Sequence, residues 1–424
     1  MRGSDFIYAI DFGTSNSLLG GAHAGGVEPL APLDPQASDP HVLRSLLYFE
    51  PGQEPSFGTH AMQRYVENSL NGRFLRSFKR FLPSKAFEGT TIGAKHWRLE
   101  ELVARFLREM RERANAHYGR DVEAAVFGRP ALFSEDAESE RLAQTRLEEA
   151  ARLAGFKHID FLPEPVAAAY RYRHEMKREE IVLVADFGGG TSDYTIIKLS
   201  DREFRPEDVL AIGGAPVAGD ALDGAVMKHR VAKHFGSEVN YRAPFGSQVL
   251  TMPRGVLSYL CSTAHIQFLN APENRAFLNQ VRAWSLGDED RRVMDQLRTL
   301  LENQLGFSIF EAIEAAKRKL STGDTAEIRF EYPDIDIREP LKQKHFESDT
   351  RAETERIFSA LDATLARAGL KAEQIHRICC TGGTAKASVV RKGLKSRFAE
   401  DRLDNFRNFT SIVEGLCERG RQLL

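Results

Sequence analysis

Two segments of this 424-residue sequence repeat one pattern, in which an apolar run ends in an aspartate and a cluster of glycine with threonine or serine leads into a second apolar run. Such a pattern predicts a β-hairpin whose tip aims backbone N–H groups and hydroxyls at phosphate oxygens, while the aspartate can organise a hydrated cation. Two such hairpins facing each other would clamp a triphosphate. The two copies are Asp11-Phe12-Gly13-Thr14-Ser15-Asn16-Ser17 and Asp186-Phe187-Gly188-Gly189-Gly190-Thr191-Ser192-Asp193.

One such hairpin alone can be an ordinary glycine turn, because Asp-x-Gly-Thr is a short pattern. The first copy, taken by itself, leaves both interpretations open. The second copy places three glycines and Thr191 between two strongly β-forming runs, which favours a phosphate loop. The repeat of the pattern therefore indicates a nucleotide-binding protein.

The composition agrees with a large nucleotide-binding protein of two lobes, since 42% hydrophobic residues over this length suffice for two or more cores. Lys and Arg total 58 against 60 Asp and Glu, so we expect no nucleic-acid partner. No apolar run reaches the length of a membrane span or a signal peptide, so we expect no membrane contact and a cytoplasmic location. The sequence has four cysteines, Cys261, Cys379, Cys380 and Cys417. They are too few and too unevenly spaced for a disulfide framework or a zinc site, so we interpret them as reduced thiols.

Alternating strand and helix patterns predict an α/β protein with mixed sheets. A charged stretch over residues 174–180 marks a junction, which divides the chain into lobe I (1–178), lobe II (179–400) and a C-terminal helix within 401–424 that returns to lobe I. The expected strands are residues 6–12, 17–22, 44–49, 123–128, 181–187, 193–199, 208–213, 326–332 and 375–381. The expected helices are residues 99–118, 136–154, 219–235, 255–270, 289–305, 309–320, 349–368 and 384–398.

Three further segments carry candidate site residues. Glu164 lies between Pro163 and Pro165 at a helix start, where it is either a capping residue or a rigidly held carboxylate that polarises water or positions a hydrated metal. Residues 314–321 form a helix end whose charged side chains also fit an ordinary solvated face. Residues 381–387 contain the pair Gly382-Gly383, which suits either a strand-to-helix turn or a backbone surface for a flat ring.

The ordered set of motifs resembles the Hsp70 chaperones, within the superfamily of actin, sugar kinases and Hsp70, and among them the short Hsp70-like proteins of the bacterial YegD type. The resemblance runs from Ile7 to about Gly420. It implies an actin-like, ribonuclease H-like fold of two lobes with a nucleotide cleft between them. It also implies an ATPase that binds ATP and ADP with Mg²⁺, and K⁺ dependence is a further expectation.

The resemblance also assigns roles to single residues. Lys79 matches the catalytic lysine and Glu164 the catalytic-site glutamate; Asp11, Asp186 and Thr191 complete the expected catalytic set. Asp11, Asp186 and Asp193 would hold Mg²⁺ mostly through water. The phosphate loops supply Gly13, Thr14, Ser15, Asn16, Gly188, Gly189, Gly190 and Thr191. The adenosine-binding residues are Glu314, Lys317, Arg318, Ser321, Gly382, Gly383, Thr384 and Lys386, and Gly219 and Asp220 complete the expected nucleotide-binding set.

The sequence also departs from the family pattern. After Gly420 only four residues remain, so we expect no peptide-binding domain. Residues 224–313 are longer than the family requires and are interpreted as an insertion that could contact a protein partner. Lys386 replaces a usual arginine, which predicts weaker stacking on adenine. Two alternatives to an ATPase therefore stay open: a nucleotide-gated binding module that leaves ATP intact, and a small-molecule kinase of the same superfamily.

Overall fold

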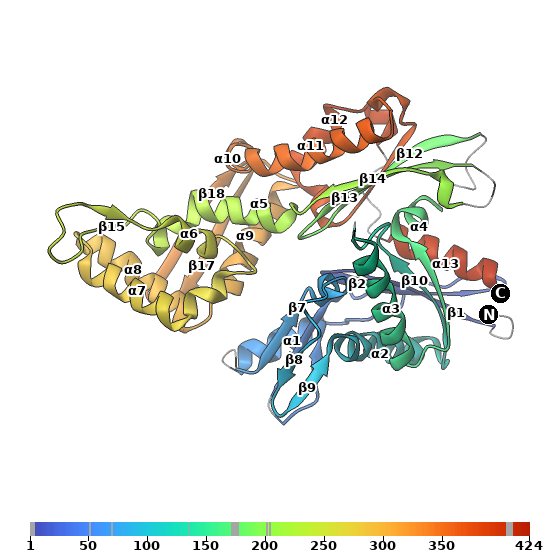
Figure 1. The fold of residues 1–424 in the computed structure, drawn as a ribbon, viewed down its shortest axis with the longest axis horizontal. Helices are drawn as coiled ribbons and strands as arrows, with labels where there is room; N and C mark the ends of the chain where they lie inside the picture. The colour runs from blue at the N-terminus through green and yellow to red at the C-terminus, as the bar shows by residue number, and fades with distance from the viewer. Residues whose placement is uncertain are drawn as a thin grey trace.

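The computed structural model describes residues 5–50, 52–68, 71–134, 136–170, 178–200, 202, 205–403 and 410–424. Figure 1 shows two lobes, with both termini in the first and a long arm that extends from the second. We call residues 5–170 together with 410–424 lobe I, and residues 178–403 lobe II. Within the described ranges, no helix combines the length and the apolar character needed to cross a membrane.

A mixed sheet forms the centre of lobe I, with the strand order β11-β10-β1-β2-β3 and with β4 beside β2. Since β1, β10 and β11 run parallel, their carboxyl ends lie at the same edge, which brings Asp11 of β1 and Glu164, directly after β11, to that edge. The bounds are β1 (Ile7–Phe12), β2 (Asn16–His23), β3 (Gly26–Val27), β4 (Leu43–Arg44), β10 (Ala124–Arg129) and β11 (His158–Pro163).

Helices cover both faces of this sheet because successive β1 side chains point to opposite sides. Tyr8 and Ile10 pack in a cluster with α2 (Leu99–Tyr118) and α3 (Ala137–Leu153). Ile7 and Ala9 pack instead with α4 (Glu164–Tyr170) and α13 (Ser411–Leu423). Helix α13 thus lies against the lobe I sheet beside α4, far from its sequence neighbours in lobe II (Figure 1).

Smaller elements extend lobe I toward lobe II. They are a sheet of order β6-β5-β7, the hairpin β8-β9, helix α1 and the 3-10 turn η1. Three side chains from this region reach lobe II: Arg44 lies 3.0 Å from Glu311, Tyr65 donates to Gln304 at 3.3 Å, and Arg76 donates to the carbonyl of Thr263. The bounds are β5 (Leu46–Phe49), β6 (Ser56–Phe57), α1 (Gly58–Glu67), β7 (Arg73–Arg76), η1 (Phe78–Phe81), β8 (Gly89–Ile92) and β9 (Lys95–Arg98).

The central sheet of lobe II has the order β14-β13-β12-β19. Strand β12 pairs antiparallel with β13 and parallel with β19, so Asp186 lies opposite Asp193 on one side and Thr381 on the other. Helix α11 (Arg351–Arg367) packs on β13 and β14. The bounds are β12 (Glu180–Phe187), β13 (Ser192–Leu199), β14 (Val209–Ala215), β19 (Arg377–Thr381), η8 (Gly383–Lys386) and α12 (Ser388–Lys395).

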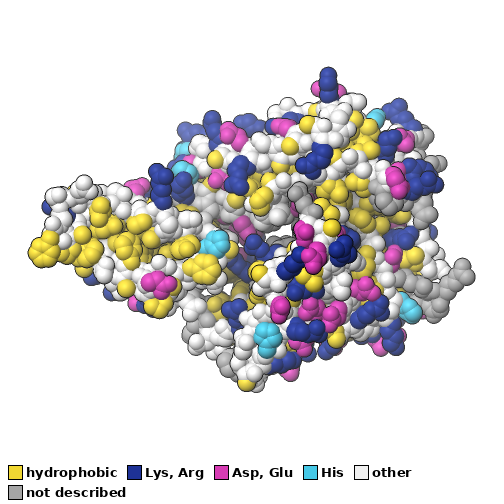
Figure 2. Space-filling view, in the orientation of Figure 1, with side chains coloured by type: hydrophobic (Ala, Val, Ile, Leu, Met, Phe, Trp, Pro, Cys, Tyr) yellow, Lys and Arg dark blue, Asp and Glu magenta, His cyan; other side chains and the backbone are white. Residues whose placement is uncertain are grey.

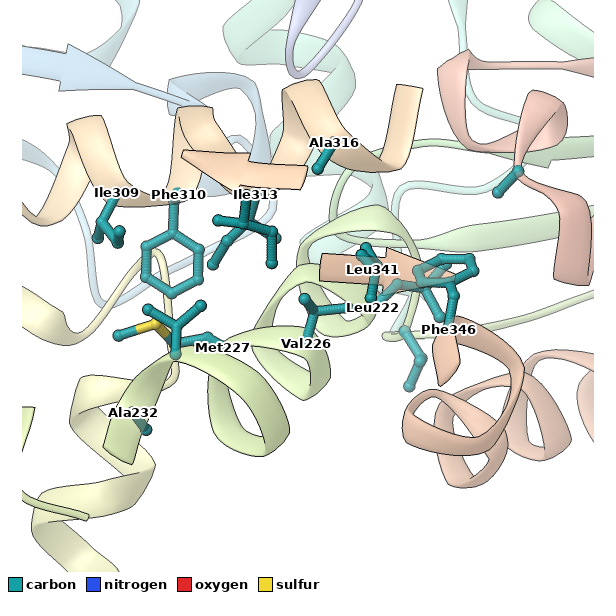
Figure 3. Close-up of a cluster of buried hydrophobic side chains, with 14 of the residues drawn as sticks. Leu222, Val226, Met227, Ala232, Ile309, Phe310, Ile313, Ala316, Leu341 and Phe346 are labelled. Atoms are coloured by element: carbon teal, nitrogen blue, oxygen red, sulfur yellow. The ribbon is translucent and has the colours of Figure 1, made fainter. Parts of the chain in front are cut away.

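A large apolar cluster joins the remaining elements of lobe II. Figure 3 shows Val226 and Met227, from α5 (Gly219–Val226) and η4 (Met227–Val231), beside Ile309, Phe310 and Ile313 of α9 (Gly306–Leu320), all of them buried. The same cluster takes in the hairpin β17-β18 and helix α10. Their bounds are β17 (Thr325–Tyr332), β18 (Ile335–Lys342) and α10 (Gln343–Asp349). The cluster fixes the amino end of α5 and the carboxyl end of α9 against each other, so Gly219 of α5 and Lys317 of α9 lie close together.

The arm consists of residues 240–302 and follows the short turn η5 (Ala232–Phe235). In Figure 2 hydrophobic side chains gather on the arm at the left end of the molecule. The exposed large hydrophobic residues there are Phe245, Val249, Leu250, Tyr259, Phe268 and Leu286. The arm elements are β15 (Asn240–Tyr241), β16 (Leu250–Thr251), α6 (Arg254–Leu260), η6 (Ile266–Asn270), α7 (Pro272–Trp284) and α8 (Asp288–Glu302).

The expected α/β class is confirmed, and most expected strands and helices are present, with 219–235 continuous but changing from α to π to 3-10 geometry. The helix expected over 255–270 is instead α6 and the 3-10 turn η6 with a break between them, and the one expected over 384–398 is the 3-10 turn η8 followed by α12. The sequence patterns missed α1, α7, β11, β18 and the short hairpins. The junction expected at 174–180 lies largely outside the described residues, which omit 171–177. None of the four cysteines, all of which lie in the described part of the chain, forms a disulfide.

Candidate functional site

The first hairpin tip, Gly13–Ser15, connects β1 to β2 and is held from the side by Ser45. The Ser45 hydroxyl donates to the carbonyl oxygen of Gly13 at 2.7 Å, and the Ser45 N–H donates to the carbonyl of Ser15 at 2.8 Å. A side chain at Gly13 would come within 2.2 Å of the Asn16 carbonyl, so the turn requires glycine there. Thr14 and Ser15 are exposed. The loop is therefore fixed in shape while its hydroxyl-bearing tip stays accessible.

The second hairpin tip, Gly188–Thr191, connects β12 to β13 and is braced by two other segments of lobe II. The Asp220 N–H donates to the carbonyl of Gly189 at 2.7 Å, and the Thr384 hydroxyl donates to the carbonyl of Gly188 at 2.8 Å. A Cβ at Gly189 would lie 3.2 Å from the Ser15 hydroxyl oxygen. The two tips, which come from different lobes, thus lie directly beside each other.

Between these tips, one lysine lies among four carboxylates. Lys79, in η1, donates to Glu164 Oε1 at 2.8 Å, and the lysine is only 8% exposed. The charges of Glu164 and Lys79 act in opposite directions on the pKa values of the other three carboxylates, those of Asp11, Asp186 and Asp193. The cluster thus carries more potential negative charge than Lys79 can neutralise.

Burial and mutual repulsion raise the pKa values of these aspartates. Burial, followed by the charge of Glu164, raises the pKa of Asp11 to about 8, although Lys79 opposes this. Burial and Glu164 likewise raise the pKa of Asp186 to about 7, against a 2.7 Å hydrogen bond from the Thr381 hydroxyl. Partial removal from water at the wall of the cleft also raises the pKa of Asp193. The 2.7 Å hydrogen bond that Asp193 accepts from the Thr191 hydroxyl opposes this shift. A bound cation would favour the charged forms of all three.

The donor set fits a hydrated cation rather than one held by side chains alone. Among the described residues, no group of three acidic or other ligating side chains lies close enough to hold a metal directly. The aspartates supply hard oxygen ligands, and Mg²⁺ usually keeps several of its waters and adds phosphate oxygens. Residues Asp11, Asp186 and Asp193 therefore fit the role of accepting hydrogen bonds from metal-bound water.

A cavity of about 50 Å³ opens onto the same carboxylates from between the lobes. Its volume is enough for a few water molecules, since one requires about 10–15 Å³. Glu164, Asp186 and Asp193 form its polar end together with Thr195 and Thr381. The apolar part is lined by Pro130, Ala131, Leu132, Pro165, Val184, Ile212 and Ile412. Water can therefore be present next to the carboxylates.

The expected adenosine-binding residues fall into two groups. Lys317 and Thr384 form the first group and meet at Gly219, because a Cβ at Gly219 would lie 2.5 Å from the Thr384 hydroxyl and 3.5 Å from Lys317 Nζ. Gly382 adopts a φ of 80°, and a side chain there would meet the carbonyl of Phe187 at 2.2 Å, so only glycine lets η8 approach β12 this closely. The others, Glu314, Arg318, Ser321, Gly383 and Lys386, occupy the same two helix ends, and Arg318 pairs with Glu314 at 3.1 Å on an exposed face.

The sequence reasoning missed several partners of these residues. Lys317 is not available as a free cation, since it is 9% exposed and donates to Asp223 Oδ2 at 2.7 Å. Burial raises the pKa of Asp223 to about 6, and the Lys317 charge opposes this shift. Ser45 and Thr381 also carry direct contacts to the site. Of these, only Thr381 had a local signal, because it begins the Thr381-Gly382-Gly383 turn.

Comparison with known proteins identifies the family. A sequence model described as Hsp70 protein matches residues 7–243 and 298–408 and leaves out 244–297 of the arm. The chain is 32% identical over 241 residues to the chaperone protein HscA homolog of Bordetella pertussis, which covers 53% of this chain and 36% of that protein. It is 26% identical over 406 residues to the chaperone protein DnaK of Thermosipho africanus, which covers 94% and 56%.

The aligned regions span from about a third to just over half of the length of these two relatives. The family match confirms the expected actin-like fold, to which the two lobes and the meeting of two phosphate-loop hairpins also conform. Because the matched residues make up well over half of the sequence, this chain belongs to the Hsp70 protein family.

Proposed function

We propose that this chain binds ATP with Mg²⁺ in the cleft between its lobes and hydrolyses the nucleotide to ADP and phosphate. The observation that carries the proposal is the buried pair of Lys79 and Glu164 among Asp11, Asp186 and Asp193, at the place where the two hairpin tips meet. Glycines and hydroxyls in the tips suit phosphate oxygens, and the acidic cluster suits a hydrated cation.

In this proposal Gly13–Ser15 and Gly188–Thr191 hold the phosphates from opposite sides. The adenosine lies toward the carboxyl end of α9 and the turn at Gly382–Lys386, where Lys317, Gly219 and Thr384 converge. Mg²⁺, when bound, neutralises charge on the phosphates. Asp11, Asp186 and Asp193 accept hydrogen bonds from its water shell.

For hydrolysis, Lys79 orients the attacking water and offsets negative charge at the γ-phosphate. Glu164 and Asp186 accept the proton of that water, directly or through a second water. Most of the rate gain then comes from positioning and electrostatics, as in phosphoryl transfer generally.

We further propose that nucleotide turnover changes the angle between the lobes and that a protein partner reads this change. The site is built from both lobes, so contacts to the phosphates couple them. The arm supports a role in protein binding, because Phe245 is fully exposed at a φ of 64°, which is a strained conformation for this residue. Aromatic side chains of this kind often anchor protein interfaces.

The decisive experiment is single-turnover hydrolysis of radiolabelled ATP by the purified chain with Mg²⁺ and K⁺, beside Lys79→Ala. The wild type should release phosphate without any acceptor, and the variant should be slower by about 100- to 1,000-fold, the usual cost of one electrostatic group. Lys85→Ala, which removes an exposed lysine paired with Glu138, is the matched control and should keep the wild-type rate.

Two other outcomes would replace this proposal. Bound but intact ATP in both proteins would favour a nucleotide-gated binding module. Deletion of residues 244–297 should then abolish binding of the protein partner and leave the affinity for nucleotide unchanged. Phosphate appearing only on an added hydroxyl compound would favour a small-molecule kinase.

A further inference from the structure

Lys79 lies on a short turn whose far end is held by a buried arginine from another part of lobe I. The turn η1 (Phe78–Phe81) follows Ser77, which adopts a left-handed φ of 54°. Arg146, in the middle of α3, places Nη1 at 3.3, 3.2 and 2.9 Å from the carbonyl oxygens of Phe81, Leu82 and Ser84, respectively. The first of these carbonyls belongs to the last residue of the turn that carries Lys79, and the other two follow the turn.

Glu100 at the start of α2 fixes Arg146 in this place. Arg146 Nε lies 3.0 Å from Glu100 Oε1, and each of the two residues is only 7% exposed. Glu100 lies in the first turn of α2, where the helix dipole favours a negative charge. A buried ion pair contributes less to stability than its charges suggest, because both groups lose their hydration. We therefore interpret the pair with Glu100 as a contact that fixes the position of the Arg146 side chain.

Arg146 holds the backbone carbonyls at the far end of the turn, whereas the side chains there pack in the core, with Leu82 buried and Phe81 stacked on Phe87 at 4.6 Å. Phe78 is buried against Phe12 and Phe106, with ring centroids 5.8 and 5.5 Å apart, which fixes the start of the turn. The N–H of Leu82 donates to the carbonyl of Lys79 at 3.1 Å, so a shift of Leu82 is passed directly to the lysine backbone. One guanidinium nitrogen of Arg146, Nη1, lies against all three carbonyls, while Nε of the same planar group faces Glu100. Lysine has a single nitrogen and cannot hold both sets of partners in this fixed geometry.

We propose that Arg146, held by Glu100, is a positioning residue for Lys79. It acts through the carbonyls of Phe81, Leu82 and Ser84 and keeps Lys79 Nζ at hydrogen-bond distance from Glu164. The hydrolysis part of the test rests on the proposed ATPase function, whereas the position of Lys79 does not. A displacement of about 1 Å at a catalytic group, caused by a change far from the reaction, can cost about 100-fold in rate.

The test uses Arg146→Lys in the full chain, with Arg152→Lys as the matched control. Arg152 lies on the same helix and pairs with Glu148 at 2.6 Å on an exposed face. Two measurements are made on each protein: single-turnover ATP hydrolysis with separate determination of ADP affinity, and the rate at which trace acetic anhydride acetylates Lys79, read by mass spectrometry. Lys79 should react slowly in the wild type, because it is buried and paired with Glu164.

Arg146→Lys should slow hydrolysis by about 10-fold, the equivalent of one lost hydrogen bond, with ADP affinity unchanged, and should raise the acetylation rate of Lys79 severalfold. Arg152→Lys should change neither quantity. Arg146→Met should slow hydrolysis by about 100-fold if it folds. If it does not fold, Arg146→Lys alone decides the matter, since it keeps the charge that pairs with Glu100.

An unchanged acetylation rate of Lys79 in Arg146→Lys would overturn the proposal, whatever the hydrolysis rate. Faster acetylation with slower hydrolysis would support it. If the wild type does not hydrolyse ATP at all, the proposed function fails, but faster acetylation in Arg146→Lys would still support the positioning of Lys79 by Arg146.

Discussion

In the described part of each lobe, one lysine is buried and pairs with a carboxylate, and the surroundings make the two pairs very different. Lys79 and Glu164 in lobe I lie 2.8 Å apart, and Lys317 and Asp223 in lobe II lie 2.7 Å apart. The lobe I lysine faces several further carboxylates, including Asp11 and Asp186, whose raised pKa values reflect an excess of negative charge. The lobe II pair is close to balanced, because the charge of Lys317 acts on Asp223 more strongly than the opposing charges of Glu314 and Asp220.

A buried lysine–carboxylate pair is therefore not in itself a sign of catalysis. Around Lys79 the carboxylates outnumber the positive charges, and this excess of negative charge attracts a cation such as Mg²⁺. Lys317 instead links α9 to α5, since it reaches both Asp223 and, at 3.4 Å, the carbonyl oxygen of Gly219. We therefore interpret Lys317 as a support for the adenosine side of the cleft. The following predictions test this contrast.

The largest effect on stability should follow removal of the balanced pair's lysine. Lys317→Met leaves Asp223 buried without its partner, and breaking a buried pair on one side costs about 3–5 kcal/mol. Urea unfolding should show this loss at pH 7.5. The loss should be smaller at pH 5, because Asp223, whose pKa is already about 6 in the intact pair, then takes up a proton.

Two variants check this interpretation of the Lys317–Asp223 pair. Lys319→Met removes an exposed lysine from the same helix and should leave stability unchanged. The double variant Asp223→Leu with Lys317→Met removes both buried charges and should recover much of the loss. If Lys317→Met were as stable as the wild type at pH 7.5, the pair would not support the lobe.

Removal of the other lysine should cost less stability. After Lys79→Met, the neighbouring Asp11 and Asp186 can hold protons near pH 7, because their pKa values are about 8 and about 7. We expect the free energy of unfolding, measured with urea at pH 7, to fall by about 1–2 kcal/mol. This is the energy equivalent of raising the pKa of one carboxylate by about one unit. A loss equal to that of Lys317→Met would contradict the contrast between the two pairs.

The acidic cluster also predicts how stability changes with pH. Asp11 and Asp186 have higher pKa values in the folded chain than the usual 3.8, so the folded state binds more protons than the unfolded state between about pH 4 and pH 8. Stability without nucleotide should therefore fall as pH rises through this window, by at most about 1.4 kcal/mol per pH unit for each group.

Thermal melts at pH 5, 6, 7 and 8 measure this slope. Asp11→Asn should flatten it, because one titrating group is lost. Mg²⁺ with ADP should flatten it as well, because the cation holds the carboxylates in their charged forms. Asp324→Asn, at an exposed aspartate outside the cluster, should keep the wild-type slope. A slope of the opposite sign in the wild type would show that other groups control the pH dependence.

The sequence alone predicted those parts of the fold that have a local signal. The two hairpins were found because apolar runs, aspartates and glycines repeat in order, and α2 was placed at its observed bounds because its apolar residues recur with helical spacing. Strand β11 was missed because its six residues include His158, Asp160 and Pro163, which weaken a strand pattern. Its place beside β10 comes from pairing within the sheet.

The site was predictable only in part, for a related reason. Glycines and aspartates of the hairpin tips stand next to one another in the sequence, whereas the resemblance to a family was needed to single out Lys79. The pairing of Lys317 with Asp223 joins residues 94 positions apart, and Arg146 reaches the turn after Lys79 across 62 to 65 positions. No local pattern records such contacts, because they arise only when the helices pack.

The smallest effect is expected for an ion pair that crosses the cleft rather than lying within one lobe. Arg44 and Glu311 are 3.0 Å apart, and each side chain is 29% exposed. Pairs of this exposure contribute about 0.2–1 kcal/mol and are screened by salt. Glu311→Gln should therefore speed release of labelled ADP by no more than about 5-fold in 50 mM salt, which is the equivalent of the upper value.

The difference between Glu311→Gln and the wild type should disappear in 500 mM salt, because a half-exposed pair is then largely screened. Glu302→Gln breaks another arginine–glutamate pair at 3.0 Å, the one with Arg275 inside the arm. It should not change ADP release at either salt concentration. A faster release that persists in 500 mM salt would mean that Glu311 acts through packing. The cross-lobe contact would then resemble the buried pairs more than its exposure suggests.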